Sequence, residues 1–143
     1  MKRHPALGGL SHDHHHELVQ ARRLLAAAEA GRDERLAAAA AYVDVFFTET
    51  VAHFRAEEER LFPAYVRAAG ESVLLRRILE EHMQLHGLVR ALRTHVAAGD
   101  VPGDELLALG GLLHDHVRAE ERELFPAIEA ALGDGLADLG LER

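Results

Sequence analysis

The stretch HFRAEEERLFP occupies residues 53–63, and the stretch HVRAEERELFP occupies residues 116–126. The two agree at eight of eleven positions, although 63 residues separate them in a chain of 143. Each contains a histidine, a glutamate four residues later and a Leu-Phe-Pro end. A spacing of four residues puts both polar side chains on one face of a helix, about one turn apart. The repeat therefore predicts two helices with similar chemistry.

The chain around the repeat has the composition of a helical protein. Hydrophobic residues make up 48% of it, which is typical of a globular chain. Ala, Leu, Glu and Arg, which favour helices, fill the segments between a few Gly and Pro residues. We expect four helices, near residues 10–30, 33–69, 72–98 and 104–132. Short connections between them favour an all-α, up-down-up-down antiparallel four-helix bundle.

The length of the chain is that of a single domain of residues 1–143, with the bundle core at about 7–132. Asp33, Ser72 and Asp104 follow glycine residues and are the expected N-caps of the last three helices. Residues 133–143 form a Gly-rich, acidic tail that either docks as a short turn or frays. The sequence leaves these two alternatives open.

Charge and hydropathy exclude several classes of partner. The formal net charge of −8 disfavours binding to nucleic acid or to anionic membranes. The chain has neither an apolar run of about 18 residues nor a charged-then-apolar leader, so we expect no membrane span or secretory signal. The absence of cysteine excludes disulfides and thiolate metal sites and is compatible with a reducing cytosol. We therefore expect a cytoplasmic protein.

Histidine is over-represented, with eleven residues where ordinary usage predicts about three. Some of them interrupt the apolar stripes that should face the bundle interior, together with two glutamates. The interrupting residues are His14, His53, Glu57, His82, His86, His116 and Glu120. His15 is an alternative to His14, and Leu85 is an alternative to His86 as the inward residue. The other histidines, His4, His12, His16, His95 and His114, are expected at the surface or beside the ligands.

The interruptions on the last three helices fall at similar heights, within roughly 5 Å at about 1.5 Å of rise per residue. His14 fits less closely, by roughly 7 Å. A buried, ionised carboxylate costs several kcal/mol unless it is paired or bound to a cation. Five imidazoles and two carboxylates are too many for one tetrahedral zinc ion. They suit two octahedral ions bridged by the glutamates, and the lack of thiolate favours iron or manganese.

Other acidic residues near these positions have an ordinary explanation. Glu58, Glu59, Glu121 and Glu123 are expected on the solvated helix face. Asp13 or Asp115 could accept a proton from a ligand imidazole, as carboxylates next to metal ligands often do.

The repeated H-x-x-x-E at 53–57 and 116–120, the H-x-x-x-H at 82–86 and the helix-one histidine resemble the bacterial type of hemerythrin-like (HHE cation-binding) domain. The resemblance covers about residues 7–132. It implies a four-helix bundle around two iron ions (Fe2+/Fe3+), one held by three histidines and the other by two. Glu57 and Glu120 would bridge them together with an oxo or hydroxo group. Dioxygen or a similar molecule would bind at an open position on the two-histidine iron.

The last carboxylate distinguishes this chain from the invertebrate oxygen carriers, which have an aspartate five residues after the histidine. Here Glu120 follows His116 by four residues, which is the pattern of the functionally diverse bacterial branch. The resemblance implies binding of dioxygen, peroxide or another small oxidant, for oxygen binding, sensing or delivery. The expected apolar pocket wall consists of Phe46, Phe47, Thr50, Leu113 and Val117.

Other functions remain open alternatives. The same centre could decompose peroxide as a catalase-like enzyme, act as an oxidase, or serve in iron storage and homeostasis. A sensor would also need an unidentified protein partner.

Overall fold

Four helical rods make up the computed structural model, which describes residues 2–141. The first rod is α1 (Gly8–Ala27), preceded by the 3-10 turn η1 (Pro5–Leu7). The second consists of α2 (Arg32–Val45), η2 (Phe46–Thr50), α3 (Val51–Ala56), η3 (Glu57–Leu61) and α4 (Phe62–Ala69). The third is α5 (Val73–Ala98). The fourth consists of α6 (Gly103–Ala119), η4 (Glu120–Leu124) and α7 (Phe125–Leu132), and the 3-10 turn η5 (Gly133–Leu139) follows it.

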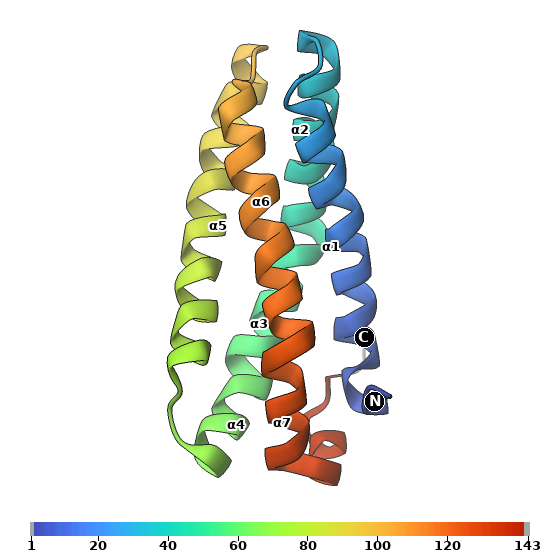
Figure 1. The fold of residues 1–143 in the computed structure, drawn as a ribbon, viewed down its shortest axis with the longest axis vertical. Coiled ribbons are helices and arrows are strands. Elements are labelled where there is room, and N and C mark those ends of the chain that lie inside the picture. Colours follow the sequence, from blue (N-terminus) through green and yellow to red (C-terminus); the bar gives the residue numbers. More distant parts are fainter. Residues whose placement is uncertain (1, 142–143) are drawn as a thin grey trace.

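The rods pack lengthwise around a common interior (Figure 1). Helix α1 contacts α2 and α6, while α5 contacts α2 and α6 from the other side. At one end of the molecule α4 packs against α7. The chain turns back at the end of each rod, so the arrangement is compatible with the expected up-down-up-down order (Figure 1). Within residues 2–141, none of the helices has the length and apolar character needed to cross a membrane.

Helix starts agree only partly with the expected caps. Ser72 is confirmed as an N-cap, because its hydroxyl accepts a hydrogen bond of 3.0 Å from the Leu75 N–H. The predicted caps Asp33 and Asp104 are wrong. They lie inside the first turns of their helices, where a negative charge interacts favourably with the helix dipole. Gly31 and Pro102 occupy the cap positions.

Three wide π-type turns interrupt the second and fourth rods, where the sequence predicted continuous helices. In each, an N–H donates to the carbonyl five residues back instead of four. The pairs are Val51 to Phe46, Phe62 to Glu57, and Phe125 to Glu120. Prolines follow two of these turns and cannot donate the hydrogen bond that a regular helix needs there. Turns of this kind occur frequently at functional sites.

Two apolar clusters fill the interior, one toward each end of the bundle. The first includes Ala21, Leu24, Tyr42, Phe46, Phe54, Leu85, Val89, Leu113 and Val117. The second includes Leu7, Leu10, Leu61, Ile78, Leu124, Phe125 and Ile128. Leu136 and Leu141 are also buried in the second cluster, so the described part of the tail docks on the bundle rather than fraying. The rods pass from one cluster to the other through a layer of polar side chains.

Candidate metal centre

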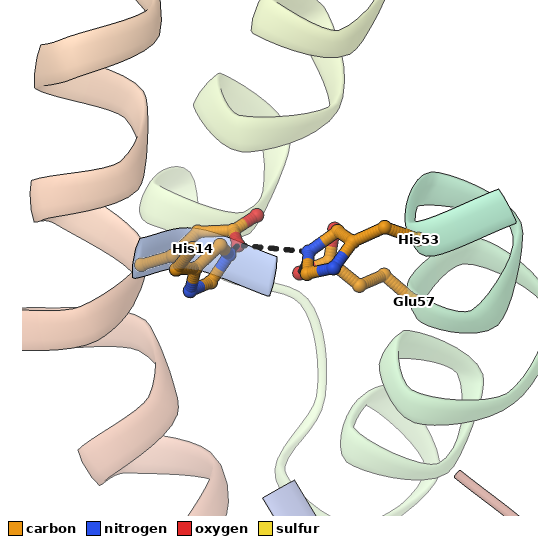
Figure 2. A group of neighbouring side chains, drawn as sticks. His14, His53 and Glu57 are labelled. Carbon is orange, nitrogen blue, oxygen red and sulfur yellow. Dashed lines mark ion pairs between the residues drawn. The ribbon is translucent and has the colours of Figure 1, made fainter. Parts of the chain in front are cut away.

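Six buried polar side chains meet in the layer between the two clusters. They come from all four rods, and none is more than 3% exposed. The six are His14, His53, Glu57, His82, His116 and Glu120. Figure 2 shows His14 reaching in from one side and His53 and Glu57 from the other. The two halves of the sequence repeat thus contribute to one cluster, although they lie on different rods.

The six side chains form two overlapping groups that could each hold a metal ion. One group is His14, His53, Glu57 and Glu120, and the other is His82, His116 and Glu120. Each glutamate faces both groups. Glu57 Oε2 lies 3.3 Å from His53 Nε2, and Glu57 Oε1 lies 3.3 Å from His82 Nε2. Glu120 Oε2 lies 2.6 Å from His14 Nε2, and Glu120 Oε1 lies 3.3 Å from His116 Nε2.

The inward-facing atoms of this cluster fit a cation. The four Nε2 atoms and the four carboxylate oxygens are all buried and have no hydrogen-bond partner within residues 2–141. These nitrogens and oxygens face only one another, so their electron pairs are satisfied in this buried layer only when a proton or a cation lies between them. Ligand atoms that share an ion at about 2.1 Å are separated by about 3–3.5 Å. Most of the separations are close to that range, so the donor set and its spacing suit bound metal.

The outer nitrogen of each of these imidazoles contacts a second carboxylate. The Nδ1 atoms lie 2.7–2.9 Å from these oxygens, and the pairs are His14–Glu121, His53–Asp13, His82–Glu58 and His116–Glu81. A carboxylate at Nδ1 keeps the proton on that nitrogen and leaves the Nε2 lone pair free for a metal. The four rings are therefore oriented toward the centre of the cluster.

These outer carboxylates were only partly foreseen. Glu58 is exposed, as expected of the solvated face, but its carboxylate contacts His82 of another rod. Glu121, expected on the same face, is half-buried and contacts His14. Asp13 makes the contact that was considered for it, whereas Asp115 lies 3.3 Å from the half-buried His114. Glu81 was missed. A usable signal exists, because each outer carboxylate is the sequence neighbour of a residue in the six-membered cluster.

Electrostatics favour positive charge inside the cluster. Burial lowers the pKa of His82, but Glu120, Glu57 and Glu58 outweigh it and raise that pKa to about 11. Burial also lowers the pKa of His116, but Glu120 and Glu81 outweigh it and raise that pKa to about 9. Burial would raise the pKa of Glu120, but the histidines hold it well below its usual value. Protons therefore supply the positive charge when no cation is bound.

For two of the predicted ligands, the sequence left a neighbouring residue as an alternative. His14 is buried in the cluster, whereas its neighbour His15 is exposed. His86 belongs to neither group. Its half-buried ring lies edge-on to Phe46, with ring centroids 5.0 Å apart. The ring would have to turn toward His82 to act as a ligand, so the ligand role of His86 stays a prediction.

The predicted pocket wall is divided between interior and surface. Phe46, Leu113 and Val117 are buried in the first apolar cluster. Phe47 is 37% exposed and the Arg93 guanidinium lies 4.9 Å from its ring, so its place in the pocket wall stays a prediction. Phe46 occupies the inward position at the start of a π turn, and the next residue therefore points outward.

Thr50 is buried, as expected of a wall residue, but it lies in a polar environment. Its hydroxyl donates a hydrogen bond to Glu17 Oε1, and the Tyr42 hydroxyl donates one of 2.9 Å to Glu17 Oε2. Glu17 is only 6% exposed, and burial raises its pKa although the two hydroxyl donors oppose the shift. Glu17 follows His14 by three residues and Thr50 precedes His53 by three. This polar layer therefore borders the group that contains His14 and His53.

Comparison with known proteins agrees with this geometry. The model of the family described as hemerythrin HHE cation binding domain matches residues 9–128, a segment that contains the whole six-membered cluster. No curated protein and no solved structure matched the chain. Domains of this family bind metal cations, usually iron. The chain belongs to the hemerythrin family of HHE cation-binding domains.

Proposed function

We propose that the six-membered cluster holds two iron ions and that dioxygen or a related small oxidant binds at an open position beside His14 and His53. One observation carries this proposal: eight buried nitrogen and oxygen atoms face one another without hydrogen-bond partners in the described chain. Glu57 and Glu120 each direct one oxygen to either half, as bridging carboxylates would. An oxo or hydroxo group would complete the bridge.

The bound iron would supply redox chemistry and a free coordination position. The chain supplies the surroundings. Glu57 and Glu120 neutralise cationic charge, and the outer carboxylates hold the imidazole rings in place. Leu113 and Val117 keep water away from the centre because their side chains are apolar and buried. Such walls admit a neutral diatomic molecule and disfavour the passage of an anion, since desolvating an anion is unfavourable.

Elemental analysis followed by optical spectroscopy tests the proposal. We expect two iron ions per chain, and a visible absorption band that develops when the ferrous protein meets air and fades under vacuum. Glu57→Ala should lose iron, because it removes an oxygen from both halves of the centre. Glu123→Gln, an exposed change within the second repeat, should not lose iron. Iron without any spectral response to air would eliminate oxygen binding, while absence of metal would eliminate the centre itself.

Peroxide decomposition is the second candidate, and Glu17 is the observation that favours it. Converting two hydrogen peroxide molecules into two water molecules and one dioxygen molecule requires proton transfer between the oxygens. A buried carboxyl group with a raised pKa, next to His14 and His53, can hold and return such a proton. The test is oxygen evolution from added peroxide. We expect Glu17→Gln to reduce it at unchanged iron content, and Glu29→Gln, at an exposed site, to leave it unchanged. Bleaching without oxygen evolution would rule this candidate out.

A further inference from the structure

The outward face of α1 carries a histidine pair that the buried centre does not use. His12 and His16 are exposed and four residues apart, so they lie on one helix face about one turn apart. Their ring centroids are 4.9 Å apart, with an angle of 51° between the rings. Two histidines with this spacing on one helix face are a recurrent metal-chelating arrangement.

A carboxylate from the neighbouring rod lies beside this pair. Glu49 of η2 places Oε1 3.8 Å from His16 Nδ1, and the two side chains are 48% and 54% exposed. Two ligands of one tetrahedral ion are separated by about 3.4 Å when each lies about 2.1 Å from the metal. Small rotations of exposed side chains would close this difference. His16 therefore has one potential ligand partner on its own helix, His12, and one on the neighbouring rod, Glu49.

The surface next to these residues is concave and carries both polar and apolar side chains. A cavity of about 400 Å³ is lined by His15, His16, Val19, Gln20, Val45 and Glu49. Gln20 Oε1 is buried and has no hydrogen-bond partner in the part of the chain that the structure describes. Gln20 follows His16 by four residues and therefore lies on the same side of α1. An acceptor without a donor in this wall adds to the attraction for a cation.

We propose that His12, His16 and Glu49 form an external binding site for a divalent first-row transition-metal ion. Neutral imidazole with one carboxylate suits Zn²⁺, Ni²⁺ and Cu²⁺. The site is separate from the buried centre, because two residues of helix rotate a side chain by about 200° and His14 therefore points to the other side of α1. The net charge of −8 favours cation binding in general. The inference does not depend on which metal the interior holds.

Equilibrium dialysis with Ni²⁺ tests this site. The protein is first saturated with the metal that it contains on purification, and the additional bound Ni²⁺ is then measured. We expect one additional ion per chain. His12→Ala and His16→Ala should each weaken its binding about tenfold or more, because one imidazole instead of two then holds the ion. Glu49→Gln should weaken it less. His114→Ala is the matched control, because this histidine has no histidine four residues away.

Two results would overturn the site. The first is Ni²⁺ binding by His12→Ala and His16→Ala that equals that of the wild type. The second is an equal loss in His114→Ala, which would mean that histidines bind the ion without a defined site. Electron paramagnetic resonance with Cu²⁺ provides a second measurement, in which the wild type should give the pattern of two coordinating nitrogens. Each exposed variant should keep its helical circular dichroism and its interior metal content, which separates this outcome from a failure of the buried centre.

Discussion

The four outer carboxylates form a closed ring around the candidate centre. Each follows or precedes a cluster residue in sequence but contacts the histidine of a different rod. The first rod supplies Asp13 to the second, the second supplies Glu58 to the third, the third supplies Glu81 to the fourth, and the fourth supplies Glu121 to the first. Every rod therefore both gives and receives one contact, so orienting the imidazoles also fixes the rods relative to one another.

Glu81 allows the role of this ring to be measured. Its side chain lies 2.8 Å from His116 Nδ1 and also accepts a hydrogen bond of 3.1 Å from Arg77 Nε. Glu81→Gln keeps the shape but removes the charge that holds the imidazole, so metal affinity should fall about 10- to 100-fold. Competition with a chromophoric chelator measures this affinity. The exposed neighbour Glu80→Gln is the control, and equal affinities in the two variants would contradict a positioning role for Glu81.

Helix packing depends on a close approach of α1 and α6 at Gly110. A Cβ atom there would lie 2.9 Å from Leu25 Cγ and 3.1 Å from the Ala21 carbonyl oxygen, and the backbone oxygen cannot easily give way. Gly110→Ala should therefore lower the free energy of unfolding by about 1–3 kcal/mol, since overpacking outweighs the gain in helix propensity. Urea unfolding measures the change.

The next residue is the matched control for this helix contact. Among residues 2–141, nothing lies within 4 Å of a Cβ atom at Gly111, which is in the same helix. Gly111→Ala should raise the free energy of unfolding by up to about 1 kcal/mol, because alanine has a higher helix propensity than glycine. Equal effects of the two substitutions would show that propensity alone, and not the approach of α1, determines stability at this position.

At the scale of elements, periodicity explains what the sequence could predict. Spacings of three and four place His14, His53 and His116 on inward stripes, and all three lie in the cluster. Periodicity failed where the helix itself changes pitch. The π turn that begins at Phe46 leaves Phe47 at the surface, which a regular helix pattern does not predict. Contacts between rods, such as Glu58 with His82, depend on side-chain conformations that no single-helix pattern contains.

At the scale of the whole molecule, the raised pKa values of the buried histidines make stability depend on pH. In the metal-free protein, the pKa of His116 is about 9 and that of His82 about 11, against an ordinary value of 6.5. A pKa raised in the folded state contributes stability that is complete below the unfolded value and is lost as pH rises through the folded one. Urea unfolding of chelator-treated protein should therefore show falling stability from about pH 6.5 to about pH 11. A flat profile would contradict charged imidazoles in the interior.

The metal-loaded protein should show a different dependence, because the cation takes the place of those protons. Loading must displace protons from His82 and His116, whose pKa values lie above neutral pH, so metal binding should acidify a weakly buffered solution. Higher pH then favours loading, and the loss of stability seen in the metal-free protein should disappear between about pH 7 and pH 9. A pH indicator during metal addition and urea unfolding of both forms measure the two effects. Parallel stability profiles without proton release would mean that the metal binds elsewhere.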